Sequence, residues 1–227
     1  MKTLFFLTKQ KILLISITIA CLLNSCGNSV SNHVDTNSEK NAELSSEVIS
    51  KLESIGFVRE YTPYIAKNKI EQNIISQMGS YINALLRLDF DNATNYVYKD
   101  IITYLKKFYP GFTIKDFFEV SSEPIIGLQQ ISDNLGLNFN VVVSSIDKII
   151  ERDNVMFCSF GTGMLLHRRF DSGKEYNFYQ PPTRDHYTIG VSFDKGKNWS
   201  FVAKSDDTPN ILRMRFSNKI ISEIMGY

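Results

Sequence analysis

Histidine and cysteine are the residue types of this chain that are most often used in chemistry, and each occurs three times in 227 residues. His33, His167 and His186 are far apart in the sequence, and no CxxC or HxxxH pair occurs. Metal sites need histidines, thiolates or carboxylates at such short spacings. The only paired glycines in a strand-like stretch, Gly161 and Gly163, lack the third glycine and the following helix of a dinucleotide loop. We therefore expect neither a metal site nor a bound cofactor.

His167 is the first candidate for acid–base chemistry. It shares strand parity with Leu165 and Phe157, so its side chain could point inward and serve as an acid or a base. Asp185 and His186 form a second polar cluster, in which Asp185 can orient a base. These three are the candidate catalytic residues. The alternative for each is a hydrogen-bonded core residue or a solvated one, and whether the protein is an enzyme stays open, with binding favoured.

Aromatic side chains gather around the same candidates. Tyr176, Phe178 and Tyr187 lie on either side of Pro181-Pro182, and together with His167 they are predicted to line a pocket mouth or a partner surface. The alternative is ordinary packing within a sheet.

Two different periodicities place these residues in a fold. Apolar residues recur at helical spacing over 70–86 and again over 97–108, and Thr113 to Asp116 resembles a capping box that opens a short third helix through Phe118. The second half changes to strand-like alternation, with a bulge or bend expected at Gly161–Gly163 and a short helix at the end. The predicted strands cover residues 137–143, 154–170, 175–179, 187–193 and 199–201, and the final helix covers 217–225. This order predicts an α+β fold, with N-terminal helices packed against a curved antiparallel sheet of four to five strands.

The N-terminus has the pattern of an export signal. Three lysines precede the apolar run 12–23, which is shorter than the ~20 residues that span a bilayer. The run ends in Leu23-Asn24-Ser25-Cys26-Gly27, which resembles the lipobox of bacterial lipoproteins. The resemblance implies removal of residues 1–25, acylation of Cys26 and a cell-envelope location, with Gly27 favouring the outer membrane. The alternative is a signal anchor with an unmodified Cys26.

The region after Cys26 divides into a tether and a folded part. Residues 27–43 contain almost no large apolar side chain and are expected to form a disordered tether that reaches about 55 Å. We therefore predict a lipidated tether over 26–43 and one domain over 44–227. Cys158 lies in an apolar strand and is expected to be an inert core thiol. With 25 basic and 24 acidic residues, the chain has no charge excess that would indicate nucleic acid as a partner.

Two further resemblances concern the fold. The order of helices and strands over about 66–204 is similar to the nuclear transport factor 2-like superfamily, which implies a cone-shaped domain with a pocket. That superfamily includes isomerases, dehydratases and non-catalytic binding domains, so it does not decide function. The stretch from Ser192 to Trp199 also fits the Asp-box pattern S-x-D-x-G-x-x-W. A single copy predicts a tight hairpin rather than a glycosidase propeller.

The sequence thus favours a lipid-anchored envelope protein that binds a small apolar or glycan-type ligand, or a protein partner, without catalysis. A small-molecule isomerase, dehydratase or hydrolase that uses His167 or Asp185 is the second hypothesis. A structural dimerisation module, which would be a homodimer, is the third.

Overall fold

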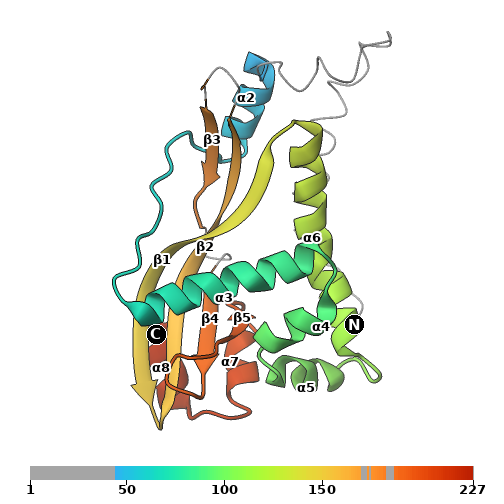
Figure 1. The fold of residues 1–227 in the computed structure, drawn as a ribbon. Helices are drawn as coiled ribbons and strands as arrows, with labels where there is room; N and C mark the ends of the chain where they lie inside the picture. Colours follow the sequence, from blue (N-terminus) through green and yellow to red (C-terminus); the bar gives the residue numbers. More distant parts are fainter. Residues whose placement is uncertain (1–43, 170–172, 174, 183–186, 227) are drawn as a thin grey trace. The chain divides into compact units, whose positions relative to one another are not determined.

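The computed structural model describes residues 44–226 except 170–172, 174 and 183–186. The elements in chain order are α2 (Ser46–Ser54), α3 (Lys69–Leu86), α4 (Phe90–Ala93), η3 (Thr94–Tyr96), α5 (Asp100–Lys106), α6 (Ile114–Asn134), β1 (Asn138–Arg152), β2 (Val155–Arg169), β3 (Glu175–Gln180), β4 (Tyr187–Ser192), β5 (Ser200–Ala203), α7 (Thr208–Leu212) and α8 (Asn218–Met225) (Figure 1). Helices precede the strands and a short helix closes the chain, so the predicted α+β class is confirmed. No helix of the described part is long and apolar enough to cross a bilayer.

The sheet has five strands in the order β1-β2-β4-β5, and β3 pairs with β2 outside this path. β2 and β4 are antiparallel, with Cys158 opposite Gly190. β4 and β5 are also antiparallel, with Gly190 opposite Phe201. Gly190 therefore has a neighbour on both sides in the middle of the sheet.

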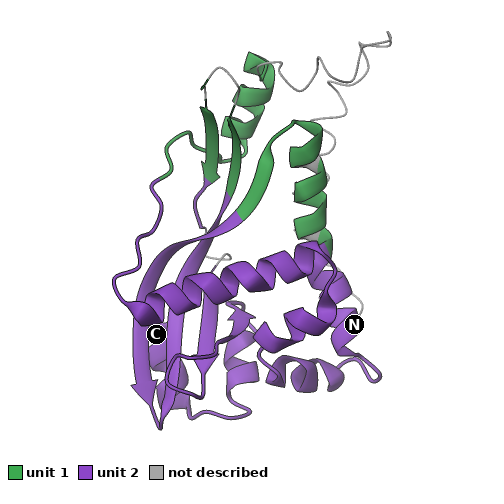
Figure 2. Cartoon of the chain, viewed as in Figure 1, with its two compact units in different colours: residues 1–61, 123–140, 165–179 green, residues 62–122, 141–164, 180–227 purple. Residues whose placement is uncertain are grey.

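The chain divides into two compact units (Figure 2). Unit 1 comprises residues 1–61, 123–140 and 165–179, and unit 2 comprises 62–122, 141–164 and 180–227. Three long elements, α6, β1 and β2, contribute residues to both units.

The core of unit 2 is aromatic and aliphatic. Its fully buried side chains come from helices and strands alike: Ile74, Leu85, Val97, Phe118, Phe157, Phe160, Ile189, Val191, Trp199 and Leu212. Burying a large side chain of this kind contributes ~1.5–3 kcal/mol. This burial is the main reason that the amphipathic helices and alternating strands assemble.

Unit 1 has a smaller core around β3. Phe178 is fully buried, and Leu52, Phe57 and Leu166 are nearly so. Val58 pairs with Tyr179 in a β-bridge, with both N–H to O distances at 2.7 Å. The chain after α2 is thereby attached to the edge of β3.

Several boundaries differ from those expected. β1 runs to Arg152 instead of ending near Val143, and α2 and α7 were not predicted. The capping box is present, because the Asp116 N–H donates to Thr113 Oγ1 (3.2 Å) and the Thr113 N–H donates to the Asp116 carboxylate (2.8 Å). However, α6 continues to Asn134 instead of ending near Phe118. β2 also runs without interruption through Gly161–Gly163. A Cβ on Gly161 would lie 2.9 Å from Pro182 Cγ, so glycine at this position permits close packing.

Candidate functional site

His167 lines an open hollow of about 230 Å³ in unit 1. The other lining residues are Arg168 and Arg169 of β2 and Glu175 and Asn177 of β3. His167 is half-buried, and its Nδ1 atom is buried with no hydrogen-bond partner among the described residues. Arg169 and Glu175 form an exposed ion pair at 3.6 Å. The hollow is therefore polar and contains one imidazole.

The predicted pocket aromatics lie elsewhere. Tyr176 and Phe178 are buried in the core of unit 1 and alternate along β3 with Glu175 and Asn177, which are the residues that line the hollow. Tyr187 begins β4 in unit 2, with Lys204 Nζ 5.9 Å from its ring centroid. The structure thus brings neither Tyr176 nor Phe178 to the lining of the His167 hollow.

Three predicted site residues cannot be placed. Asp185, His186 and Cys26 lie outside the described residues. The acid–base role of the first two and the acylation of the third remain predictions.

A larger hollow, of about 380 Å³, lies between α7 and α8 in unit 2. Its walls carry a carboxylate, two amides, a guanidinium and a hydroxyl, with a proline and an isoleucine as the apolar part. The lining residues are Asp206, Pro209, Asn210, Arg213, Asn218, Ile221 and Ser222. None of them was predicted from the sequence, because exposed polar residues on two short helices have no distinctive pattern.

Arg213 is hydrogen-bonded to two other residues that line this hollow. Its Nη1 donates to Asn210 Oδ1 at 2.6 Å, and its Nε donates to Asn218 Oδ1 at 2.9 Å. The guanidinium therefore joins α7 to the first residue of α8 and is held in a defined orientation. An oriented fork of N–H donors beside amides suits a ligand with several oxygen atoms.

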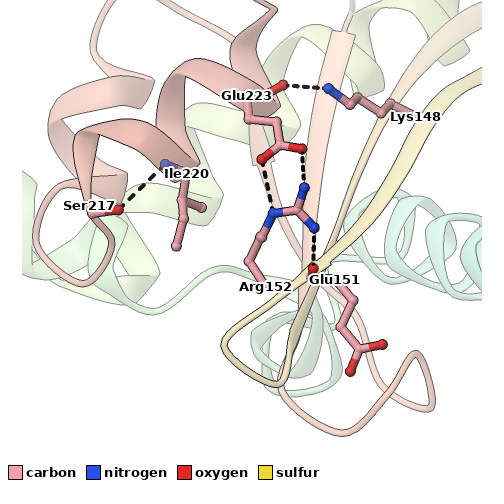
Figure 3. Close-up of polar contacts among 6 residues, drawn as sticks. All are labelled: Lys148, Glu151, Arg152, Ser217, Ile220 and Glu223. Carbon is pink, nitrogen blue, oxygen red and sulfur yellow. Dashed lines mark hydrogen bonds and ion pairs between the residues drawn. The ribbon is translucent and has the colours of Figure 1, made fainter.

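α8 is fixed to β1 by charged contacts (Figure 3). Arg152 makes a two-point contact with the Glu223 carboxylate, with Nη2 at 2.6 Å and Nε at 3.1 Å. Lys148 Nζ donates to the Glu223 carbonyl oxygen at 3.0 Å. At the start of the helix, Ser217 Oγ accepts from the Ile220 N–H, and Gly226 ends the helix with φ 79°. α8, which forms one wall of the hollow, is therefore fixed at its start by the Ser217 cap and near its end by the contacts of Glu223 with β1.

α7 is anchored by different contacts. The Thr208 hydroxyl is fully buried, donates to the Ala203 carbonyl at 2.7 Å and accepts from the Ser205 N–H at 2.8 Å. Tyr104 Oη donates to the Asp207 carboxylate at 3.0 Å. The second wall is therefore attached to the end of β5 and to α5.

Other polar clusters of unit 2 have structural roles. Glu71 is buried near the start of α3, where it accepts from the Lys67 N–H at 2.7 Å and from Tyr64 Oη at 2.8 Å. Burial raises the pKa of Glu71, but these hydrogen bonds outweigh it and hold that pKa below its usual value. Burial and the bond to Glu71 raise the pKa of Tyr64 to about 12. The pair is thus fixed as carboxylate and phenol across the neutral range.

Cys158 and the Asp-box hairpin behave as expected. Cys158 is buried, and burial raises the pKa of its thiol, so it is an inert core residue. In the hairpin, the Asp194 carboxylate accepts from the Asn198 N–H at 2.8 Å, Gly196 has φ 80°, and Trp199 is buried. No group of three or more metal-ligating side chains occurs in the described part of the chain.

No protein-family model, curated protein or solved structure matches the chain. The lipoprotein signal and the nuclear transport factor 2-like resemblance therefore stay predictions. Any assignment of function has to come from the sites described above.

Proposed function

We propose that the chain is a lipid-anchored cell-envelope protein that binds a glycan-type ligand in the hollow between α7 and α8, without catalysis. The lipobox-like sequence ending at Cys26 supports the anchor. The observation that carries the binding role is the hollow of about 380 Å³, in whose lining two amides hold the Arg213 guanidinium. Clefts of roughly 300–1,000 Å³ hold small ligands in many proteins.

The lining favours a glycan over an apolar ligand. Five of the seven lining residues are polar, and two are apolar, Pro209 and Ile221. Hydroxyl-rich ligands need several donors and acceptors in fixed positions, and a small apolar surface can contact the C–H face of a sugar ring. An apolar ligand would leave these polar groups without partners, at a cost of ~1–3 kcal/mol for each group that becomes buried.

The groups with a displaced pKa have structural roles and do not line either hollow. In the described residues, every displaced pKa is displaced away from neutrality: below the usual value for Glu71, Asp100, Asp116 and Asp194, and above it for Tyr61, Tyr64, Tyr81, Tyr98, Tyr104, Cys158 and Arg215. Hydrogen bonds and ion pairs lower the carboxyl values, and burial raises those of the phenols and the thiol.

A binding experiment tests the ligand site. The full chain is titrated with oligosaccharides of N-acetylglucosamine and of uronic acids, and binding is measured by calorimetry. We expect binding of at least one probe, weakened at least tenfold by Arg213→Ala, since hydrogen bonds to a charged group contribute ~1.5–3 kcal/mol. Lys219→Ala is the matched control, because this exposed residue of α8 is not part of the lining. Equal binding by both variants would place the ligand elsewhere.

Native mass spectrometry of protein purified from its own host envelope separates the hypotheses. A retained mass of a few hundred daltons that Arg213→Ala removes supports binding in this hollow. A dimer with no retained mass supports the dimerisation module instead.

A second candidate function rests on His167. Its Nδ1 is buried and has no hydrogen-bond partner among the described residues, and the residue lines a hollow of about 230 Å³. If the protein is an isomerase, dehydratase or hydrolase of this kind, His167→Ala will abolish turnover while the urea midpoint stays close to that of the parent. Binding without chemistry predicts that the same variant still retains its ligand.

The anchor has its own test. Cells that express the chain are labelled with radioactive palmitate and then fractionated. We expect the label and the membrane association to disappear in Cys26→Ser. A labelled Cys26→Ser protein in the membrane fraction would refute the lipoprotein assignment.

A further inference from the structure

The turn that joins α5 to α6 can be followed in Figure 1. It is rich in aromatic and basic residues. Residues 106–112, the basic-aromatic corner, read Lys-Lys-Phe-Tyr-Pro-Gly-Phe. No acidic residue lies between Asp100 and Asp116. The corner belongs entirely to unit 2.

Phe108 is presented to solvent on a rigid support. Its side chain is 59% exposed, and its ring lies edge-on to Tyr104 with centroids 5.2 Å apart. Tyr104 is itself buried and bonded to Asp207. Backbone hydrogen bonds from the Phe108 and Tyr109 N–H groups to the Leu105 carbonyl hold the end of the helix. An exposed aromatic ring that is held in position is typical of protein surfaces that contact a membrane or a partner molecule.

Two lysines precede Phe108 in the corner. Lys106 and Lys107 are exposed and form no ion pair with any described residue. Lys107 Nζ lies 6.0 Å from the Tyr104 ring centroid, so its stem follows the aromatic surface. Tyr109 and Phe112, with ring centroids 6.3 Å apart, complete the corner and are half-buried.

We propose that the basic-aromatic corner docks unit 2 on an anionic phospholipid surface, with Phe108 inserted at the level of the headgroups. Lysine stems can lie along apolar surface while their ammonium groups reach phosphates, and aromatic rings are enriched at bilayer interfaces. Each lysine near an anionic membrane strengthens the contact by about fivefold.

A lipid anchor at the N-terminus would bring the corner close to a bilayer. This step rests on the proposed acylation of Cys26. Residues 27–43 would then link the bilayer to the folded part, with a reach of at most about 55 Å. A tether of this length keeps the local concentration of membrane surface high, so that even a weak second contact is occupied.

Tryptophan placed in the corner tests the proposal. The acylated full chain carrying Phe108→Trp is reconstituted in vesicles of phosphatidylcholine with phosphatidylglycerol, and emission is quenched by brominated lipids. Trp199 is 1% exposed and serves as a constant background. The matched control is Phe193→Trp, because Phe193 is 50% exposed but lies against Arg215 and Phe216 instead of lysines.

We expect strong quenching of Phe108→Trp and little quenching of Phe193→Trp. Adding Lys106→Gln and Lys107→Gln should lower the ratio of docked to undocked protein by about thirtyfold. Vesicles of phosphatidylcholine alone should also lower the ratio of docked to undocked protein. Equal quenching at the two positions, or quenching that does not change when Lys106 and Lys107 are substituted, overturns the proposal.

A measurement without substitutions guards against misfolded variants. Hydrogen exchange of the parent protein should slow at residues 106–112 when the vesicles contain phosphatidylglycerol, and unchanged exchange there counts against docking. Mass spectrometry of the same preparation reports the acyl chains on Cys26. If Cys26 carries acyl chains but residues 106–112 are not protected from exchange, docking by the corner is refuted and the lipid anchor stands. If residues 106–112 are protected but Cys26 carries no acyl chain, docking by the corner stands and the lipid anchor is refuted.

Discussion

A methyl group on residue 190 has almost no space in this protein. Gly190 lies opposite Cys158 in the β2–β4 pair, and a Cβ there would lie 2.5 Å from Cys158 Sγ and 3.1 Å from Trp199 Cε3. Carbon and its neighbours prefer ~3.5–4.0 Å, so the overlap with the sulfur is about 1 Å. Both neighbours are buried at about 1% exposure, so neither can move into solvent.

Gly190→Ala should therefore destabilise the protein. Overpacking of a core costs ~1–3 kcal/mol, which exceeds the ~0.4–1 kcal/mol gained when alanine restricts the unfolded chain. We expect a net loss of ~1–2 kcal/mol in the free energy of unfolding. Urea unfolding followed by the fluorescence of the single tryptophan measures this loss.

Two further variants make the test specific. Gly79→Ala, within α3, is the matched control: nothing lies within 4 Å of its Cβ, so it should gain ~0.5–1 kcal/mol. Cys158→Ala removes the clashing sulfur, so the double variant should be more stable than the sum of the single losses predicts, by ~0.5–3 kcal/mol. Strict additivity, or a Gly190→Ala protein as stable as its parent, would refute the described register.

Three other perturbations address the hairpin, α8 and α6. Hydrogen bonding, first from the Asn198 N–H, lowers the pKa of Asp194, so its contribution to stability is complete above the unfolded pKa of about 3.9 and is lost as the pH falls through the lower folded value. Asp194→Asn should flatten the fall of the urea midpoint below about pH 4, and a slope equal to that of the parent would contradict this. Arg152→Ala should lower the free energy of unfolding by ~0.5–1 kcal/mol, because the ion pair with Glu223 is bidentate but partly exposed and therefore screened by solvent. The same variant should exchange amide hydrogens faster in α8. Thr113→Ala removes the cap of α6 and should cost ~0.5–2 kcal/mol, with faster exchange confined to the first turn.

The fold followed from sequence patterns wherever burial has a clear period. The apolar stripe over 70–86 predicts α3, because it places one helical face in the core. The alternation at 187–193 predicts the strand β4, although Thr188 to Ser192 are buried on both faces of the sheet. The length of α6 was missed, since its second half lacks such a stripe and contains a proline at position 124. The continuity of β2 was missed because Gly161 was expected to mark a bend, although its reason is the nearby Pro182 ring.

The candidate sites were less predictable than the fold. His167 was singled out by its strand parity with Leu165 and Phe157. In the structure it is half-buried and lines a hollow, while its neighbour Leu166, of opposite parity, is the buried residue. Arg213 and Asn218 carried no signal, because their contact depends on the turn that joins α7 to α8. Asn210 and Arg213 are three residues apart and therefore lie on one helical face, and this spacing was the only local indication of their contact.

The division into units has a consequence for biosynthesis. Unit 1 needs residues from three separate stretches, the last of which ends at residue 179, and unit 2 ends only at 227. If the chain is exported N-terminus first, as the proposed function requires, residues up to 179 have to emerge before unit 1 can close and residues up to 227 before unit 2 can close. Helices with local contacts form early, but β-pairing between distant residues has to wait. In that interval apolar strand residues of both units would be exposed together, and a chaperone that shields extended apolar segments would act on them.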